Sequence, residues 1–155
     1  MKSILAIDPG ASGGIVIIHN GTVAMPMPDT SADVVDVVKN FAYSAIAEGA
    51  ECVAYVERVG GFVGKRQPGS AMFRFGFGAG VIEGALISYG VRTIYVRPQE
   101  WQKHFSLGTA ASCASKTEWK NKLKAEAQRR FPNLKVTLAT ADALLIADYA
   151  ANLES

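Results

Sequence analysis

The chain has 155 residues, 49% of them hydrophobic, so it is long enough to bury one sizeable core and falls within the usual size of a single domain. We therefore expect one domain that spans residues 1–155. The formal net charge of +2 does not by itself indicate a polyanionic partner.

Two further features exclude broad classes of protein. No apolar run approaches the ~20 residues needed to cross a bilayer, and the N-terminus lacks the layout of a signal peptide. Cys52 and Cys113 have neither the pairing pattern nor the spacing of a disulfide framework or a zinc site. We therefore expect a soluble, cytoplasmic protein with two free thiols and no membrane partner.

Three strands are predicted in the N-terminal part of the chain. They cover residues 3–8, 15–18 and about 22–25. The first ends at Asp8 and is followed by a glycine-rich turn. Asn20-Gly21 is a strong hairpin signal, so the third strand should pair antiparallel with the second. Together these strands predict an antiparallel meander.

The rest of the chain alternates helices and strands. Helical spacing of apolar residues, capping residues and glycine or proline stops predict helices at about 31–48, 70–89, 98–104, 115–131 and 141–152, with Ser31 and Ser115 as N-caps. Strands are expected at 51–57 and 91–96. This order implies an α/β fold in which helices flank a five-stranded mixed sheet, with parallel strands after the meander.

Three carboxylates are candidates for chemistry. Asp8 and Glu57 each end an apolar strand, a placement that costs desolvation, although a single acid after a strand is more often a solvated turn residue. Asp142 should lie in the first turn of the last helix, where the helix dipole favours an acid. Because this helix is too apolar for the surface, its first turn is expected to lie against the sheet, where the three could converge.

Converging carboxylates repel one another, and without a cation at least one should keep its proton at a raised pKa. A divalent metal removes this conflict. The three acids supply hard oxygen ligands without a His or Cys cluster, which favours Mg²⁺, or Mn²⁺ as a substitute, over zinc. Such ions, especially as a pair about 4 Å apart, activate water and stabilise the leaving oxygen in phosphodiester hydrolysis.

Several motifs then resemble, in order, those of the RuvC-type Holliday junction resolvases. They are Ala6-Ile7-Asp8-Pro9-Gly10 with Gly13-Gly14, Tyr55-Val56-Glu57, and residues 141–147, ADALLIA. Residues 75–80, FGFGAG, and 97–103, RPQEWQK, are similar to the phage-encoded and organellar branches of that family. The similarity spans nearly the whole chain.

The resemblance implies a ribonuclease H-like fold, a homodimer, magnesium dependence with two ions per site, and paired nicks across a four-way DNA junction. By motif position, Asp8, Glu57 and Asp142 would be the catalytic metal ligands. Bacterial members carry a further carboxylate where this chain has Ala139. Asp148 is no substitute, because six residues along a helix rotate it by about 240° from Asp142. No small-molecule cofactor is implied, and the expected location is the nucleoid or a phage-infected cell, or alternatively an organelle.

Basic and aromatic residues predict the DNA-binding surface, because cations neutralise phosphates and exposed rings stack on splayed bases. The candidates are Arg58, Phe62, Lys65, Arg66, Phe73, Arg74, Lys116, Lys120 and Lys124. Phe77 is instead expected in the core, and Glu83 has no assigned role. Glycines 76, 78, 80 and 84 share one predicted helix, so a helix should pack closely there, either within the chain or from a second copy.

Three alternatives remain open. The first is a nucleotide-binding fragment of the actin and sugar-kinase fold, although the chain has room for only one of the two domains that close on ATP. The second keeps the ribonuclease H-like fold but acts on other branched DNA or on structured RNA. The third is a non-catalytic junction-binding protein, consistent with the missing fourth carboxylate.

Overall fold

In a computed structural model of the chain, residues 2–58 and 68–155 are described. The elements in chain order are β1 (Lys2–Asp8), β2 (Gly14–Ile18), β3 (Thr22–Pro26), α1 (Ser31–Ala47), β4 (Glu51–Glu57), α2 (Gly69–Ser88), β5 (Arg92–Val96), α3 (Pro98–His104), the 3₁₀ turn η1 (Ala110–Ser112), α4 (Lys116–Arg130) and α5 (Leu138–Glu154). Their order and types are those predicted, with the addition of η1.

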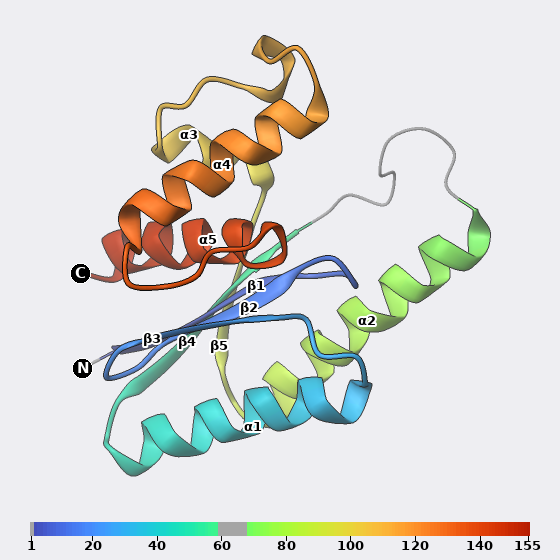
Figure 1. The fold of residues 1–155 in the computed structure, drawn as a ribbon. Coiled ribbons are helices and arrows are strands. Elements are labelled where there is room, and N and C mark those ends of the chain that lie inside the picture. Colours follow the sequence, from blue (N-terminus) through green and yellow to red (C-terminus); the bar gives the residue numbers. More distant parts are fainter. Residues whose placement is uncertain (1, 59–67) are drawn as a thin grey trace.

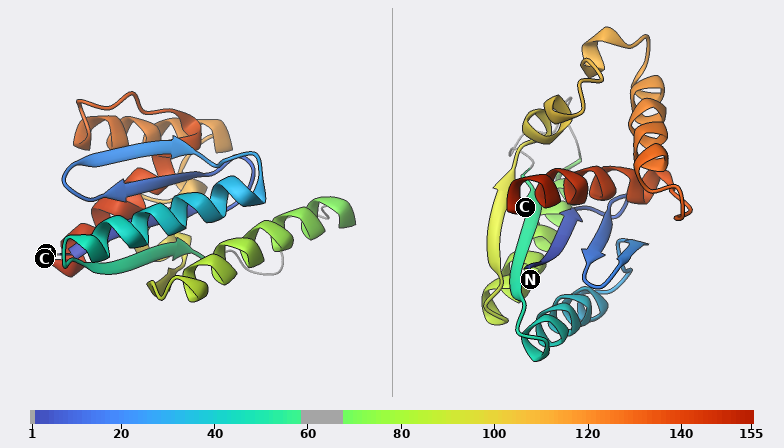
Figure 2. Two further views of the ribbon diagram at one scale, coloured as in Figure 1. Left: turned by 90° about the horizontal axis from the view of Figure 1, so that it is seen from below. Right: turned by 90° about the vertical axis from the view of Figure 1, so that its left-hand side faces the viewer.

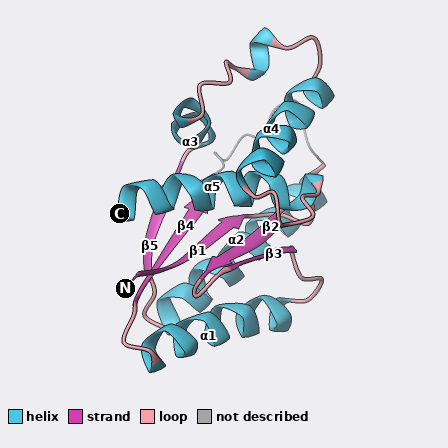
Figure 3. Ribbon diagram, turned by 60° about the vertical axis from the view of Figure 1, so that its left-hand side comes forward, coloured by secondary structure: helices cyan, strands magenta, loops and turns pink. Residues whose placement is uncertain are grey.

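The strands form one mixed sheet in the order β3-β2-β1-β4-β5 (Figure 3). β1, β2 and β3 pair antiparallel, whereas β4 is parallel to β1 and β5 is parallel to β4. The predicted five-stranded mixed sheet is therefore confirmed. Since β1 and β4 run side by side in parallel, with Ile7 opposite Val56, their carboxyl ends meet at one edge of the sheet.

Helices cover both faces of the sheet (Figures 1 and 2). α1 and α2 lie on one face, and α5 lies on the other, with α3 and α4 packed outside it. Successive side chains of β1 point to opposite faces of the sheet and so contribute to two hydrophobic clusters. Ile4 and Ala6 belong to the cluster beneath α5, and Leu5 and Ile7 belong to the cluster beneath α1. A central strand buried on both faces explains the continuous apolar run before Asp8.

The turn between β1 and β2 needs glycine at two positions. A Cβ at Gly13 would collide with the carbonyl oxygen of Asp8, and a Cβ at Gly14 would lie 2.5 Å from the carbonyl oxygen of Ala139. Gly14 is also the β2 residue paired with Asp8. The first turn of α5 can therefore approach the end of β1 closely.

Three sequence-based expectations need correction. Thr30, rather than Ser31, is the N-cap of α1, since its hydroxyl accepts from the amide of Asp33 at 3.1 Å. α5 begins at Leu138, so Asp142 lies in its second turn, beyond the strongest effect of the helix dipole. By length and composition alone, α2 could cross a membrane, contrary to the expectation that no segment could; this is weak evidence by itself.

Candidate active site

Asp8, Glu57 and Asp142 are brought together at the carboxyl end of the central strands. Asp8 ends β1 and Glu57 ends the neighbouring β4. Asp142 reaches the same place because the start of α5 packs on Gly14, the residue opposite Asp8. Its neighbours Ala141 and Ala143 are buried, so this part of α5 does lie against the sheet as expected.

The pKa values of the three acids are raised by burial and, for two of them, by the charges of the other acids. The pKa of Asp8 is raised from 3.8 to about 8, first by burial and then by the charges of Glu57 and Asp142. Burial is also the main cause that raises the pKa of Glu57 to about 7, and Asp142 adds to it. The pKa of Asp142 is raised by burial as well. Carboxylates perturbed by burial and by one another are candidates for a functional site.

Among the described residues, one cation acts electrostatically on the acids. The charge of Lys120, on α4, lowers the pKa values of Asp8 and Asp142 and so opposes the effect of burial. It does not form an ion pair with either acid, and the carboxylates of Asp8 and Asp142 make no hydrogen bond to any other described residue. Two half-buried acids thus lack a direct partner within residues 2–58 and 68–155.

The donor chemistry of these acids fits a hard divalent cation, because all three offer carboxylate oxygens and their mutual repulsion would fall if a cation bound. The described residues include no group of three or more His, Cys, Asp or Glu side chains already closed into a metal cage. The three acids are therefore electrostatically coupled but not preassembled. Ala139 stands at the position of the expected fourth carboxylate. Its backbone carbonyl lies close to Gly14, and its methyl side chain cannot bind a cation.

Glu57 has a partner that the sequence analysis missed. Its Oε2 accepts a hydrogen bond from the indole Nε1 of Trp101, at 2.7 Å. Trp101 is fully buried. The contact arises because Glu57 pairs with Val96 across β4 and β5, and α3 begins two residues after Val96. A tryptophan in a short predicted helix gives no signal of which acid it will meet, so only the register of the sheet could have identified the pair.

Two other acids, Asp148 and Glu83, interact with residues outside the candidate site. Asp148 pairs with Arg130, at 2.8 Å between Oδ2 and Nη1, as expected for a structural residue. Glu83 accepts from the hydroxyl of Tyr95 at 3.2 Å, and Arg58 lies over the ring of that tyrosine, 5.0 Å from its centroid. Neither acid is among the charges that act on Asp8.

The predicted DNA-binding residues separate into two regions. Lys116, Lys120 and Lys124 lie on α4, where the first two are exposed and the third is half-buried. Phe73 and Arg74 are exposed near the start of α2, and Arg58 is exposed next to Glu57. The remaining three candidates, Phe62, Lys65 and Arg66, lie outside the described residues.

Helix α2 departs most from expectation. Phe77, predicted in the core, is 58% exposed, because the first half of α2 extends beyond the edge of the sheet (Figures 1 and 2). Exposed residues follow one another at helical spacing along one face: Phe73, Gly76, Phe77, Gly80, Gly84 and Ile87. We call this set the α2 stripe. A Cβ at any of its glycines would meet no other described atom within 4 Å, so the expected close packing is not found within the described chain.

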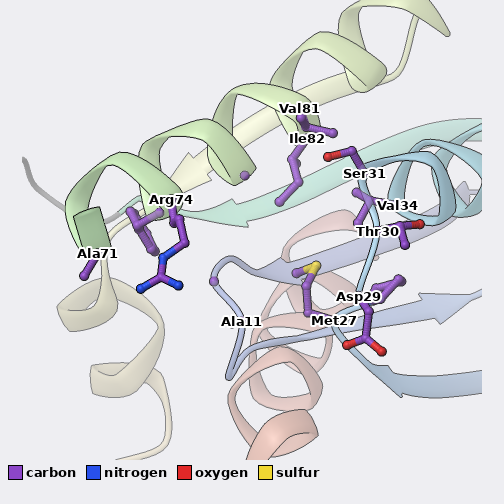
Figure 4. Close-up of a pocket in the computed structure, with 14 residues that line it drawn as sticks. Ala11, Met27, Asp29, Thr30, Ser31, Val34, Ala71, Arg74, Val81 and Ile82 are labelled. Carbon is purple, nitrogen blue, oxygen red and sulfur yellow. The ribbon is translucent and has the colours of Figure 1, made fainter. Parts of the chain in front are cut away.

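A pocket of about 420 Å³ lies between α2, the β1–β2 turn and the segment leading into α1 (Figure 4). Arg74 extends into it from α2 toward Ala11, and Asp29 lies on the opposite wall. The lining is otherwise mostly apolar and includes none of the three acids. A second pocket of about 280 Å³ is lined by Glu57 and Arg58.

Comparison with known proteins identifies the fold. No family model matches the chain. No curated protein matches it either. Among solved structures, the chain is similar to the Thermus thermophilus RuvC structure, with 16% identity, a TM-score of 0.57, and coverage of 98% of this chain and 96% of that one. It is also similar to T. thermophilus RuvC in complex with a Holliday junction substrate, with 14% identity, a TM-score of 0.61, and coverage of 97% and 96%. The chain therefore has a RuvC-like fold of the ribonuclease H-like class.

Proposed function

We propose that this chain is a metal-dependent endonuclease that cleaves four-way DNA junctions by paired nicks. The observation that carries the proposal is that Asp8 and Glu57 end neighbouring strands at one edge of the sheet, with the start of α5 packed beside them; the pKa of Asp8, raised to about 8 by burial and by the charges of Glu57 and Asp142, agrees with this placement. The similarity of the fold to a RuvC that was solved with a Holliday junction supports the choice of substrate.

The three acids would act as ligands. Asp8, Glu57 and Asp142 would hold Mg²⁺ or Mn²⁺, and lose their mutual repulsion as they do so. When bound, such a cation supplies activation of a water molecule and stabilisation of the leaving oxygen in phosphodiester hydrolysis. Lys120, whose charge already reaches Asp8 and Asp142, is suited to hold the scissile phosphate over the acids.

The DNA would contact the lysines of α4 and Arg58, which follows Glu57. Lys120 and Lys116 are exposed and one turn apart, so both can reach successive phosphates. Arg58 immediately follows Glu57 and is exposed. Lysines on α4 and an arginine beside Glu57 would then bind phosphates around the acids.

The homodimer would form through the α2 stripe. Gly76, Gly80 and Gly84 recur every fourth residue, which lets a second helix approach closely. Phe73 and Phe77 flank them and pack on one another, with centroids 6.1 Å apart, although both are exposed to solvent. An apolar exposed face of this kind is typical of a protein–protein contact. A two-fold dimer would supply two sets of acids, one for each nick.

The test is cleavage of a synthetic four-way junction with labelled arms, with linear duplex, fork, RNA–DNA hybrid and structured RNA as parallel substrates. We expect Mg²⁺-dependent nicks on two opposite strands of the junction and little cleavage of linear duplex. Preferred cleavage of structured RNA or forks would support the alternative substrates, and tight junction binding without any cleavage in Mg²⁺ or Mn²⁺ would support a non-catalytic junction-binding protein.

A further inference from the structure

Glu57 is one of the three acids, and it forms a hydrogen bond with Trp101. The proposed function gives this hydrogen bond no role. The indole Nε1 donates to Glu57 Oε2 at 2.7 Å, and the whole tryptophan is buried at 0% exposure. It is the only hydrogen bond of a described residue to this carboxylate. Asp8 and Asp142 have no comparable contact with the described part of the chain, so Glu57 is the one acid whose orientation is fixed.

Trp101 is itself held on several sides. Pro98 starts α3, and the side chain of Glu100 accepts from the amide of Arg97 at 2.6 Å, which fixes the first turn of the helix. The indole then packs edge-on against Phe105, with centroids 6.4 Å apart, inside the core beneath α5. A donor fixed in this way holds its acceptor at one distance and direction.

The chemistry of the indole suits a positioning role. Its N–H is a donor only and carries no charge, so it does not compete with a cation for Glu57, and it does not neutralise the carboxylate as an arginine would. It occupies one oxygen, Oε2, and leaves Oε1 without a hydrogen bond from the described residues. The carboxylate therefore keeps lone pairs for a cation, while the hydrogen bond restricts the direction in which its plane faces.

We propose that Trp101 is a positioning residue that orients the carboxylate of Glu57, so that Glu57 would be held ready to bind a divalent cation. This inference rests on the proposed function, because it requires that Glu57 bind a divalent cation. Among three acids that are not preassembled, Glu57 would then be the one ligand whose orientation is set by the described residues. Loss of a partner that orients a metal ligand typically weakens metal affinity by about 10–100-fold.

The first measurement needs no variant of the positioning residue. The chain has two tryptophans, so ¹⁵N-labelled protein gives two indole N–H signals, assigned with Trp119→Phe. We expect saturating Mg²⁺ to shift the Trp101 signal strongly, because the charge on its acceptor is drawn to the cation, and to shift the Trp119 signal less. An unmoved Trp101 signal, with the cation shown to be bound, would overturn the inference.

The second measurement compares Trp101→Phe with Trp119→Phe, which removes the same donor from a buried ring on α4. Free Mn²⁺ is counted by its EPR signal, without DNA. We expect Trp101→Phe to weaken Mn²⁺ binding by about tenfold or more and Trp119→Phe to leave it within about twofold. Equal affinities in folded variants would overturn the positioning role while leaving the nuclease proposal intact. No Mn²⁺ binding by the unchanged protein would overturn both.

Discussion

Replacement of Asp8 by asparagine should stabilise the metal-free protein at neutral and mildly alkaline pH. The folded pKa of Asp8, about 8, is above its ordinary value of 3.8. The folded state therefore keeps a proton that the unfolded state loses between these values, and stability falls as pH rises through that window. An asparagine side chain has no proton to lose. In Asp8→Asn, this position would therefore no longer make the free energy of unfolding depend on pH.

The size of the effect follows from the same two values. A difference of about 4 pH units corresponds to at most ~6 kcal/mol, and water that reaches a half-buried carboxylate lowers this to ~2–3 kcal/mol. For a chain of this length, each kcal/mol moves the melting temperature by about 2–4 °C. We therefore expect the melting temperature of the metal-free wild type to fall by about 5–10 °C relative to Asp8→Asn between pH 5 and pH 8.

The assay is thermal unfolding by circular dichroism in chelator, at several pH values. The matched control is Asp29→Asn, since Asp29 is an exposed aspartate. It should follow the wild type at every pH. Parallel curves for wild type and Asp8→Asn would refute the reasoning, because Asp8 would then ionise as an ordinary solvated aspartate. Added Mg²⁺ should raise the melting temperature of the wild type at pH 8 and leave that of Asp8→Asn nearly unchanged.

Three further predictions concern catalysis, binding and assembly. Asp142→Asn should lower the junction cleavage rate by at least about 100-fold in a single-turnover assay, whereas Asp148→Asn should retain the rate and lose only the ion pair with Arg130; the opposite result would remove Asp142 from the site. Replacing Lys116 and Lys124 together by alanine should reduce the slope of log affinity against log salt by about 1–2 in a junction-binding titration, and an unchanged slope would place the DNA elsewhere. Phe77→Asp should convert a dimer into a monomer in light scattering, and an unchanged mass would exclude the α2 stripe as the interface.

The fold could be predicted from the sequence largely because β1 and β4 are buried on both faces. Their apolar runs, the Asn20-Gly21 hairpin signal and the glycine stops are local features, and they suffice for the order and type of elements. The first and last residues of the helices and strands could be predicted less well than their order and type. The start of α5 was predicted three residues late because its N-cap, Thr137, which accepts from the amide of Thr140, was not recognised as a capping residue.

The site was predictable where it depends on strand ends and on the apolar character of the last helix. Asp8 and Glu57 follow from parallel pairing, since neighbouring strands end at one edge of a sheet. The contact of Trp101 with Glu57 depends on how α3 packs, which has no local signal. Phe77 was misplaced for a related reason: an apolar residue in an amphipathic pattern predicts a buried face, but the pattern does not say whether the chain itself or a partner buries it.

The claim that Asp8, Glu57 and Asp142 form a divalent metal centre is tested most directly by anomalous diffraction from crystals grown in Mn²⁺. We predict one or two anomalous peaks, about 4 Å apart if two, with oxygens of all three acids at ~2.0–2.3 Å. No peak at this edge of the sheet at saturating Mn²⁺, or a peak bound by other residues, would contradict the claim.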